Sequence, residues 1–185
     1  MIYKILTITI IVLLFILITI VIYFAKNGIF KRIKPTIKET GGFAITKRTF
    51  TGNQEDILTE FEKQMDILKS FDIGYAHPIC SYDNIPNKEN ILTNAEIGFV
   101  LYKGTEENLI KLEKHIPLGT FEKKERIVVY FPFKGGLSIQ IGIAKAYPAI
   151  KKYAKKHNIK TEKITELYNS INKRIEYMID FQRLS

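Results

Sequence analysis

The sequence predicts an α+β protein, in which an antiparallel sheet is built from a duplicated strand-helix-strand-strand unit with two long helices, preceded by one transmembrane helix. Three observations predict this class: an uncharged apolar run at the N-terminus, short apolar runs of strand length that end at glycines, and two stretches with apolar residues at helical spacing. Of the 185 residues, 46% are hydrophobic and 25% are charged. This composition excludes a polytopic membrane protein, a disordered chain and a coiled coil.

The N-terminal run from Ile5 to Phe24 contains no charged residue. A bilayer core of about 30 Å needs about 20 such residues in a helix. A cleaved signal peptide would have a shorter apolar core of about 7–15 residues, followed by a small-x-small cleavage site. Here only Ala25 is small, and Tyr23 occupies the position two residues before it. We therefore expect residues 1–25 to form an uncleaved transmembrane anchor.

Positive charge follows the apolar run more than it precedes it. Only Lys4 comes before the run, whereas four basic residues follow it closely: Lys26, Lys31, Arg32 and Lys34. Because such flanks stay in the cytoplasm, we expect the N-terminus outside and the C-terminal domain in the cytoplasm. The membrane would be the endoplasmic reticulum in a eukaryote or the inner membrane in a bacterium. The single cysteine, Cys80, agrees with a compartment without disulfides.

A basic linker is expected over residues 26–41, where Pro35 and a glycine pair interrupt any helix. The domain then spans residues 42–185, with a first repeat over about 42–104. Asn53 is a plausible N-cap for the first long helix, whose apolar residues recur at helical spacing. In order, we expect a strand over 43–50, this helix, a strand over 73–82, a polar loop over 82–94 and a strand over 95–102.

A short helix over 106–114 leads to a second repeat over about 125–182. Gly135 and Gly136 open a long amphipathic helix, which Pro148 must bend or restart because proline has no N–H to donate. Strands are expected over 126–133, 162–168 and 174–181. The segments 50–52 (Phe-Thr-Gly) and 133–135 (Phe-Lys-Gly) each close a strand before a helix, which supports an internal duplication.

Four segments carry a family resemblance. They are Tyr-Phe-Pro-Phe-Lys-Gly-Gly-Leu-Ser-Ile at 130–139, Ala-Tyr-Pro-Ala-Ile-Lys-Lys-Tyr at 146–153, Glu-Leu-Tyr at 166–168 and Arg-Ile-Glu-Tyr-Met at 174–178. With them the chain resembles the GyrI-like small-molecule-binding domain family, closest to the testis-expressed protein 264 group, over about residues 42–181. Vertebrate members of that group carry a long C-terminal tail with an autophagy motif, whereas this chain ends at Ser185.

The resemblance implies a cleft between the two repeats that binds cationic or planar organic molecules through aromatic walls and a buried carboxylate. Glu176 is the candidate carboxylate, since it lies between apolar neighbours in the last strand. The candidate walls are Tyr102, Tyr130 and Phe133, and Gly98 is expected opposite Glu176, where it leaves room beside the carboxylate. The alternative is that Glu176 is an exposed strand residue and that the aromatic residues are core.

The expected function is a single-pass membrane protein that presents a ligand-binding or adaptor domain to the cytoplasm. The sequence holds no catalytic constellation and no Cys/His spacing for zinc, so we expect neither an enzyme, a cofactor nor a metal. Expected partners are the bilayer, a small cationic or aromatic ligand and a protein; no nucleic acid is expected, because the lysines over 151–160 are typical of a solvated helix face. The alternatives are a hydrolase of strained electrophiles, with Glu176 as acid or base, and a selective-autophagy receptor.

Overall fold

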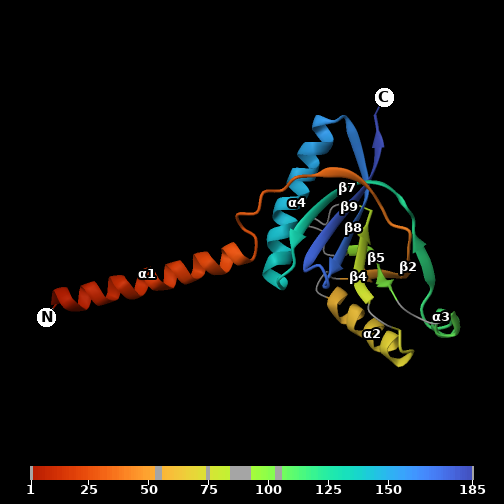
Figure 1. Ribbon diagram of the computed structural model, residues 1–185, viewed down its shortest axis with the longest axis horizontal. Coiled ribbons are helices and arrows are strands. Elements are labelled where there is room, and N and C mark those ends of the chain that lie inside the picture. Colours follow the sequence, from red (N-terminus) through yellow and green to blue (C-terminus); the bar gives the residue numbers. More distant parts are fainter. Residues whose placement is uncertain (1, 53–55, 74–75, 84–92, 103–105, 185) are drawn as a thin grey trace.

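A computed structural model of the chain describes residues 2–52, 56–73, 76–83, 93–102 and 106–184 (Figure 1). The helices are α1 (Ile2–Lys26), α2 (Asp56–Ser70), α3 (Glu106–Glu113) and α4 (Gly136–Lys156). The strands are β1 (Thr36–Thr40), β2 (Phe43–Thr46), β3 (Arg48–Gly52), β4 (Ala76–Tyr82), β5 (Thr93–Leu101), β6 (Leu118–Phe121), β7 (Lys124–Pro132), β8 (Ile159–Asn169) and β9 (Arg174–Arg183).

The strand-helix-strand-strand order occurs twice, as β3-α2-β4-β5 and as β7-α4-β8-β9. The strands form one curled antiparallel sheet in the order β1-β7-β9-β8-β4-β5-β2-β6, and β3 also pairs with β5. The two units meet at the centre of this sheet, where β4 pairs with β8. The α+β class and the duplicated order predicted from the sequence are confirmed.

Helices α2 and α4 cover one face of the sheet, and the opposite face has its own apolar cluster (Figure 1). Along β7, Ile127, Val129 and Phe131 pack with α4, whereas Val128 points to the other face. This alternation follows from the period of two in a strand. Because both faces bury apolar side chains, β7 is apolar at every position from Ile127 to Pro132.

The segment between α1 and β2 contains a strand that the sequence did not predict. Residues 36–40, within the expected linker, form β1 and pair with β7. The strand expected over 43–50 is two strands, β2 and β3, and β6 was also not predicted. The expected helix start at Asn53 and most of the expected loop over 82–94 lie outside the described residues.

Helix α1 stands away from the domain and none of its membrane-length segment is buried (Figure 1). Within the described residues it is the helix that is long and apolar enough to cross a membrane, from Tyr3 to Lys26, although an N-terminal signal sequence has the same character. The hydroxyls of Thr7, Thr9 and Thr19 donate hydrogen bonds to the carbonyls four residues earlier. These bonds satisfy the polar groups of an otherwise apolar helix.

Candidate functional site

A row of paired residues crosses the centre of the helix-covered face and contains one carboxylate. Cys80 of β4 lies opposite Glu166 of β8, which in turn lies opposite Tyr177 of β9. All three side chains are buried. The antiparallel pairing of β4 with β8 thus places an acidic side chain at the junction of the two repeats, in the region between α2 and α4.

Glu166 is only 2% exposed, and its partners are phenols. The hydroxyl of Tyr147, from α4, donates a hydrogen bond to Oε1, and that of Tyr168, two residues along β8, donates to Oε2. In the described part of the chain, no lysine or arginine forms an ion pair with Glu166. Burial raises the pKa of the carboxyl group, and the two phenol hydrogen bonds oppose this rise. A carboxyl group in this setting is either protonated or requires a cation.

The groups around Glu166 are neutral donors. Burial and the nearby carboxylate raise the pKa of four phenols, those of Tyr82, Tyr147, Tyr168 and Tyr177. Burial also raises the pKa of the Cys80 thiol to about 12, so this thiol stays protonated at neutral pH and is a poor nucleophile.

One phenol of this group has no hydrogen bond. The Tyr177 hydroxyl is buried, and it has no partner among the described residues. It points at α4, where a side chain at Gly142 would overlap the hydroxyl oxygen. A buried hydroxyl costs free energy when it is left unpaired, and among the described residues the Tyr177 hydroxyl is such a group near Glu166.

Glu176, the carboxylate expected from the sequence, lies on the opposite face of the sheet. It is 8% exposed, and its Oε1 accepts hydrogen bonds from Arg174 Nε at 2.9 Å and Asn169 Nδ2 at 3.1 Å. The Arg174 guanidinium also lies 4.3 Å from the centre of the Tyr130 ring, and Tyr130 pairs with Glu176 across β7 and β9. The charge of Glu176 is therefore already matched by a cation of the protein.

Of the other three expected site residues, Tyr102 lies near Glu176, whereas Phe133 and Gly98 lie away from it. Tyr102 is 49% exposed, and burial and the Glu176 charge together raise its pKa. Phe133 packs beside the Glu166 group, with its ring centre 5.8 Å from that of Tyr168. Gly98 shares a cross-strand row with Glu176, but β4 and β8 separate them. A side chain at Gly98 would overlap the carbonyl oxygen of Thr46, so this glycine permits close contact between β2 and β5.

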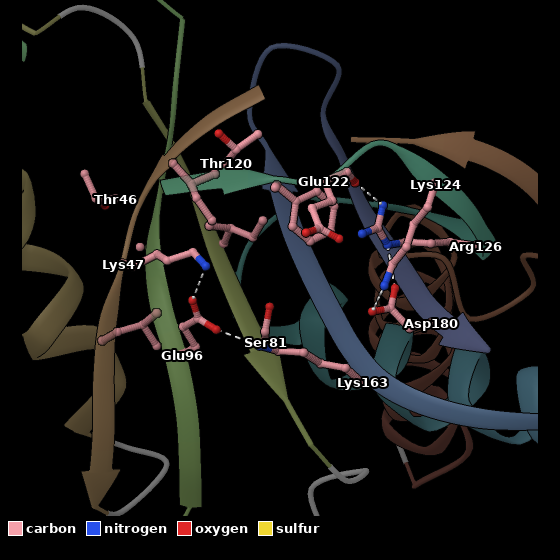
Figure 2. A pocket seen from close by; sticks show the side chains of 15 residues that line it. Thr46, Lys47, Ser81, Glu96, Thr120, Glu122, Lys124, Arg126, Lys163 and Asp180 are labelled. Atoms are coloured by element: carbon pink, nitrogen blue, oxygen red, sulfur yellow. Dashed lines mark hydrogen bonds and ion pairs between the residues drawn. The ribbon is translucent and has the colours of Figure 1, made fainter. Parts of the chain in front are cut away.

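A hollow of about 210 Å³ lies on the helix-free face (Figure 2). Two of the three carboxylates in its lining, Glu96 and Asp180, form ion pairs with lining lysines and arginine (Figure 2). Glu96 forms ion pairs with Lys47 at 3.2 Å and with Lys163 at 2.6 Å. Asp180 forms ion pairs with Lys124 at 2.7 Å and with Arg126 at 2.6 Å. Glu96 and Asp180 each already have two cations, and the third carboxylate, Glu122, is exposed to solvent, so among the described residues this hollow presents no buried, unmatched negative charge to a cationic ligand.

Glu166 was part of the sequence segments that carry the resemblance, but it was not among the candidate site residues. In β8 the residues Ile164 and Leu167 are both buried, on opposite faces. Alternation therefore gives no sign of which face the helices cover. Only the pairing of β8 with β4, which joins residues 86 positions apart in the case of Glu166 and Cys80, reveals that Glu166 lies between the repeats.

Comparison with known proteins gives matches at the level of structure. No family of known sequences and no curated protein matches the chain. The C-terminal domain of EcmrR is similar, with a TM-score of 0.57, 12% identity, and coverage of 82% of this chain and 99% of that one. SAV2435 bound to tetraphenylphosphonium has a TM-score of 0.52, 12% identity, and coverage of 80% and 94%.

A hydrolase from Listeria innocua is also similar, with a TM-score of 0.52, 12% identity, and coverage of 80% and 92%. At these identities the likeness concerns the fold alone. The duplicated element order, the curled antiparallel sheet and these structural neighbours together show that the chain has the GyrI-like fold.

Proposed function

We propose that this chain is a membrane-anchored GyrI-like domain that binds a small lipophilic organic cation at Glu166. The observation that carries the proposal is a buried carboxylate that has two phenol donors and forms no ion pair in the described part of the chain. Arg174 already neutralises the alternative carboxylate, Glu176. We therefore favour Glu166 over Glu176 as the binding carboxylate.

A lipophilic cation fits this environment for two reasons. Its charge offsets the cost of a buried carboxylate, and its apolar groups replace the water that the site excludes. Four phenol rings lie near the carboxylate, those of Tyr82, Tyr147, Tyr168 and Tyr177, and these aromatic surroundings suit a cation that carries aromatic groups. The structural neighbour SAV2435, whose structure contains tetraphenylphosphonium, has a ligand of this chemical class.

The remainder of the proposal concerns location. We place α1 across the membrane as an uncleaved anchor and the domain in the cytoplasm, because basic residues follow the apolar span closely. A domain held at the membrane surface would meet lipophilic cations where they concentrate. The proposed relationship to the testis-expressed protein 264 group rests on the sequence segments given above, and an adaptor role would use the same domain.

Ligand binding to the full chain in lipid nanodiscs tests the proposed site. Tetraphenylphosphonium should bind the wild type, whereas tetraphenylborate, which has the same shape and the opposite charge, should not. Glu166→Gln should weaken cation binding at least tenfold, and Glu176→Gln is the matched control that should retain it. Equal affinity of wild type and Glu166→Gln would refute the site. Failure of the wild type to bind any of a broad panel of organic cations would favour a protein-binding surface instead.

A hydrolase is the second candidate. A buried carboxyl group whose pKa is raised keeps its proton to a higher pH than an ordinary glutamate, which suits a general acid. The similarity to the Listeria innocua hydrolase gives this alternative additional support. Incubation of the full chain with strained cyclic electrophiles distinguishes the two candidates, because turnover that disappears in Glu166→Gln would favour the enzyme.

A further inference from the structure

We propose that α4 and the segment after α1 form a surface that binds anionic lipid headgroups and holds the domain against the bilayer. The proposal rests on the proposed membrane anchor and adds a second contact with the membrane. It would fix which side of the domain faces the lipid and which side faces the cytoplasm.

The distribution of charge is the first observation. Residues 26–34 and α4 together contain nine basic residues and no aspartate or glutamate: Lys26, Lys31, Arg32, Lys34, Lys145, Lys151, Lys152, Lys155 and Lys156. The other 19 basic residues of the chain equal its 19 acidic residues in number. The whole net charge of +9 is therefore concentrated in these two segments.

The pairing of these residues is the second observation. Among the described residues, no acidic side chain forms an ion pair with any of the nine. Lysines on the other helices differ, since Lys69 of α2 contacts Asp66 and Lys111 of α3 contacts Glu107. The second half of α4 has four lysines that are exposed to solvent: Lys151, Lys152, Lys155 and Lys156. Their charge is free to meet an external anion.

The position of α4 is the third observation. Helix α4 runs crosswise to α1 and lies between the end of α1 and the sheet (Figure 1). The connection is short and fixed, because Lys145 of α4 donates a hydrogen bond to the Ile29 carbonyl. Gly28 adopts a φ of 91° and lies so close to the Phe131 ring that a Cβ would be 2.7 Å from it. A bilayer around α1 would thus lie next to the outer side of α4.

The exposed residues where α4 lies next to the segment after α1 have the character of a membrane interface. Phe30, which follows the anchor, is 71% exposed. On α4, Ala144 and Pro148 are exposed and uncharged near the anchor, and the exposed lysines follow farther along the helix. Apolar side chains flanked by lysines are typical of helices that lie in a membrane interface. Anionic lipid, rather than nucleic acid, is the partner that this position next to the anchor favours.

Fluorescence quenching in nanodiscs tests the surface. A fluorophore on Ala144→Cys of the full chain reports the distance to quenchers on lipid headgroups, and Thr120→Cys, in β6 at the far edge of the sheet, is the control position. Labelling is selective because Cys80 is buried and its thiol stays protonated. We expect at least twofold stronger quenching at position 144 in discs with one-third phosphatidylglycerol than in phosphatidylcholine discs, and loss of this difference at 0.5 M salt.

Two charge-matched variants complete the experiment. Replacement of Lys151, Lys152, Lys155 and Lys156 by glutamine should abolish the difference between the two lipids. Replacement of four exposed lysines on and beside α2 and α3 by glutamine should preserve it: Lys63, Lys69, Lys111 and Lys114. If quenching at position 144 depends neither on lipid charge nor on the α4 lysines, the lipid-binding surface is rejected. The proposed anchor is not affected by that result.

Failure of the anchor gives a different result. If alkaline carbonate extracts the full chain from membranes, the anchor is wrong, and the surface that rests on it is rejected with it. A short DNA duplex can be added to anionic discs at a phosphate concentration equal to that of the lipid. If it abolishes the quenching at position 144, the α4 surface binds nucleic acid in preference to lipid. That outcome would also overturn the proposal.

Discussion

The carboxyl group of Glu166 makes the stability of the domain depend on pH in an unusual direction. Its pKa in the folded chain is raised above the ordinary value of 4.5, chiefly by burial. Between 4.5 and the raised value, the unfolded chain releases a proton that the folded chain keeps, so stability falls as pH rises. Most carboxylates, which are paired with cations, have the opposite effect.

Glu166→Gln should remove this pH dependence, since an amide cannot ionise. We expect the wild type to lose up to about 1.4 kcal/mol per pH unit relative to the variant above pH 4.5. Urea unfolding of both proteins between pH 5 and pH 8 measures the difference. Parallel pH profiles would contradict the raised pKa of Glu166.

Two tyrosines in contact with the same site should respond differently to loss of the hydroxyl. Tyr147→Phe leaves a carboxyl oxygen of Glu166 without its donor, and we expect a loss of about 1–3 kcal/mol. Tyr177→Phe removes a hydroxyl without a partner among the described residues, so its stability should change by less than about 0.5 kcal/mol. Thermal unfolding of the two variants provides the comparison. A larger loss for Tyr177→Phe than for Tyr147→Phe would reverse the assignment of roles.

At the scale of elements, Arg126 joins three parts of the sheet. It is 2% exposed, and it donates hydrogen bonds to Asp180 of β9, to the carbonyl of Thr40 in β1 and to the carbonyl of Glu122 before β7. Its guanidinium also lies 4.0 Å from the centre of the Phe121 ring in β6. This one side chain therefore links both ends of the strand order, which helps the sheet to curl.

Arg126→Met should destabilise the domain by about 3–5 kcal/mol, because Asp180 and two carbonyls lose their buried donor. The control is Arg183→Met, which breaks an exposed ion pair with Glu125 of 3.5 Å and should cost less than about 1 kcal/mol. Chemical denaturation of both variants measures these costs. Equal costs would show that the buried network does not stabilise the fold.

The helices and strands that were predicted correctly are those with a clear hydrophobic pattern in the sequence. The helical spacing of apolar residues gave α2 and α4, and the apolar runs gave β7 and β9. Strand β1 escaped prediction because its residues, Thr-Ile-Lys-Glu-Thr, are mostly exposed on an edge strand and lack an apolar run. Edge strands owe their structure to hydrogen bonds with a partner, here β7, which local sequence does not encode.

The candidate site was less accessible to prediction than the fold. Glu166 and Glu176 each have a buried apolar residue next to them in the chain, and their strands pair with each other. A face of the sheet is identified only by what packs on it, and both faces here are apolar. The sequence therefore indicated that a strand carboxylate was buried, but not which of the two lies beside the helices and lacks a protein cation.

At the scale of the whole molecule, the short connection between α1 and the domain makes topology testable. We expect alkaline carbonate to leave the full chain in membranes, because a helix such as α1 inserts almost irreversibly. Protease added to sealed vesicles with the cytoplasmic side outward should digest the domain. Protection of the domain in these vesicles would place it on the opposite side and contradict the orientation.

Proton release on ligand binding is a direct test of the proposed site. It shows whether a lipophilic cation binds next to the Glu166 carboxyl group, which is buried and has no ion pair among the described residues. If Glu166 is protonated in the free domain and ionised beside the cation, binding must release its proton. Calorimetric titration of the full chain with tetraphenylphosphonium near pH 6, in buffers with different ionisation enthalpies, counts the protons. We predict that binding releases a proton from the wild type and from Glu176→Gln. Binding by the wild type without proton release, or with the same release in Glu166→Gln, would contradict the account.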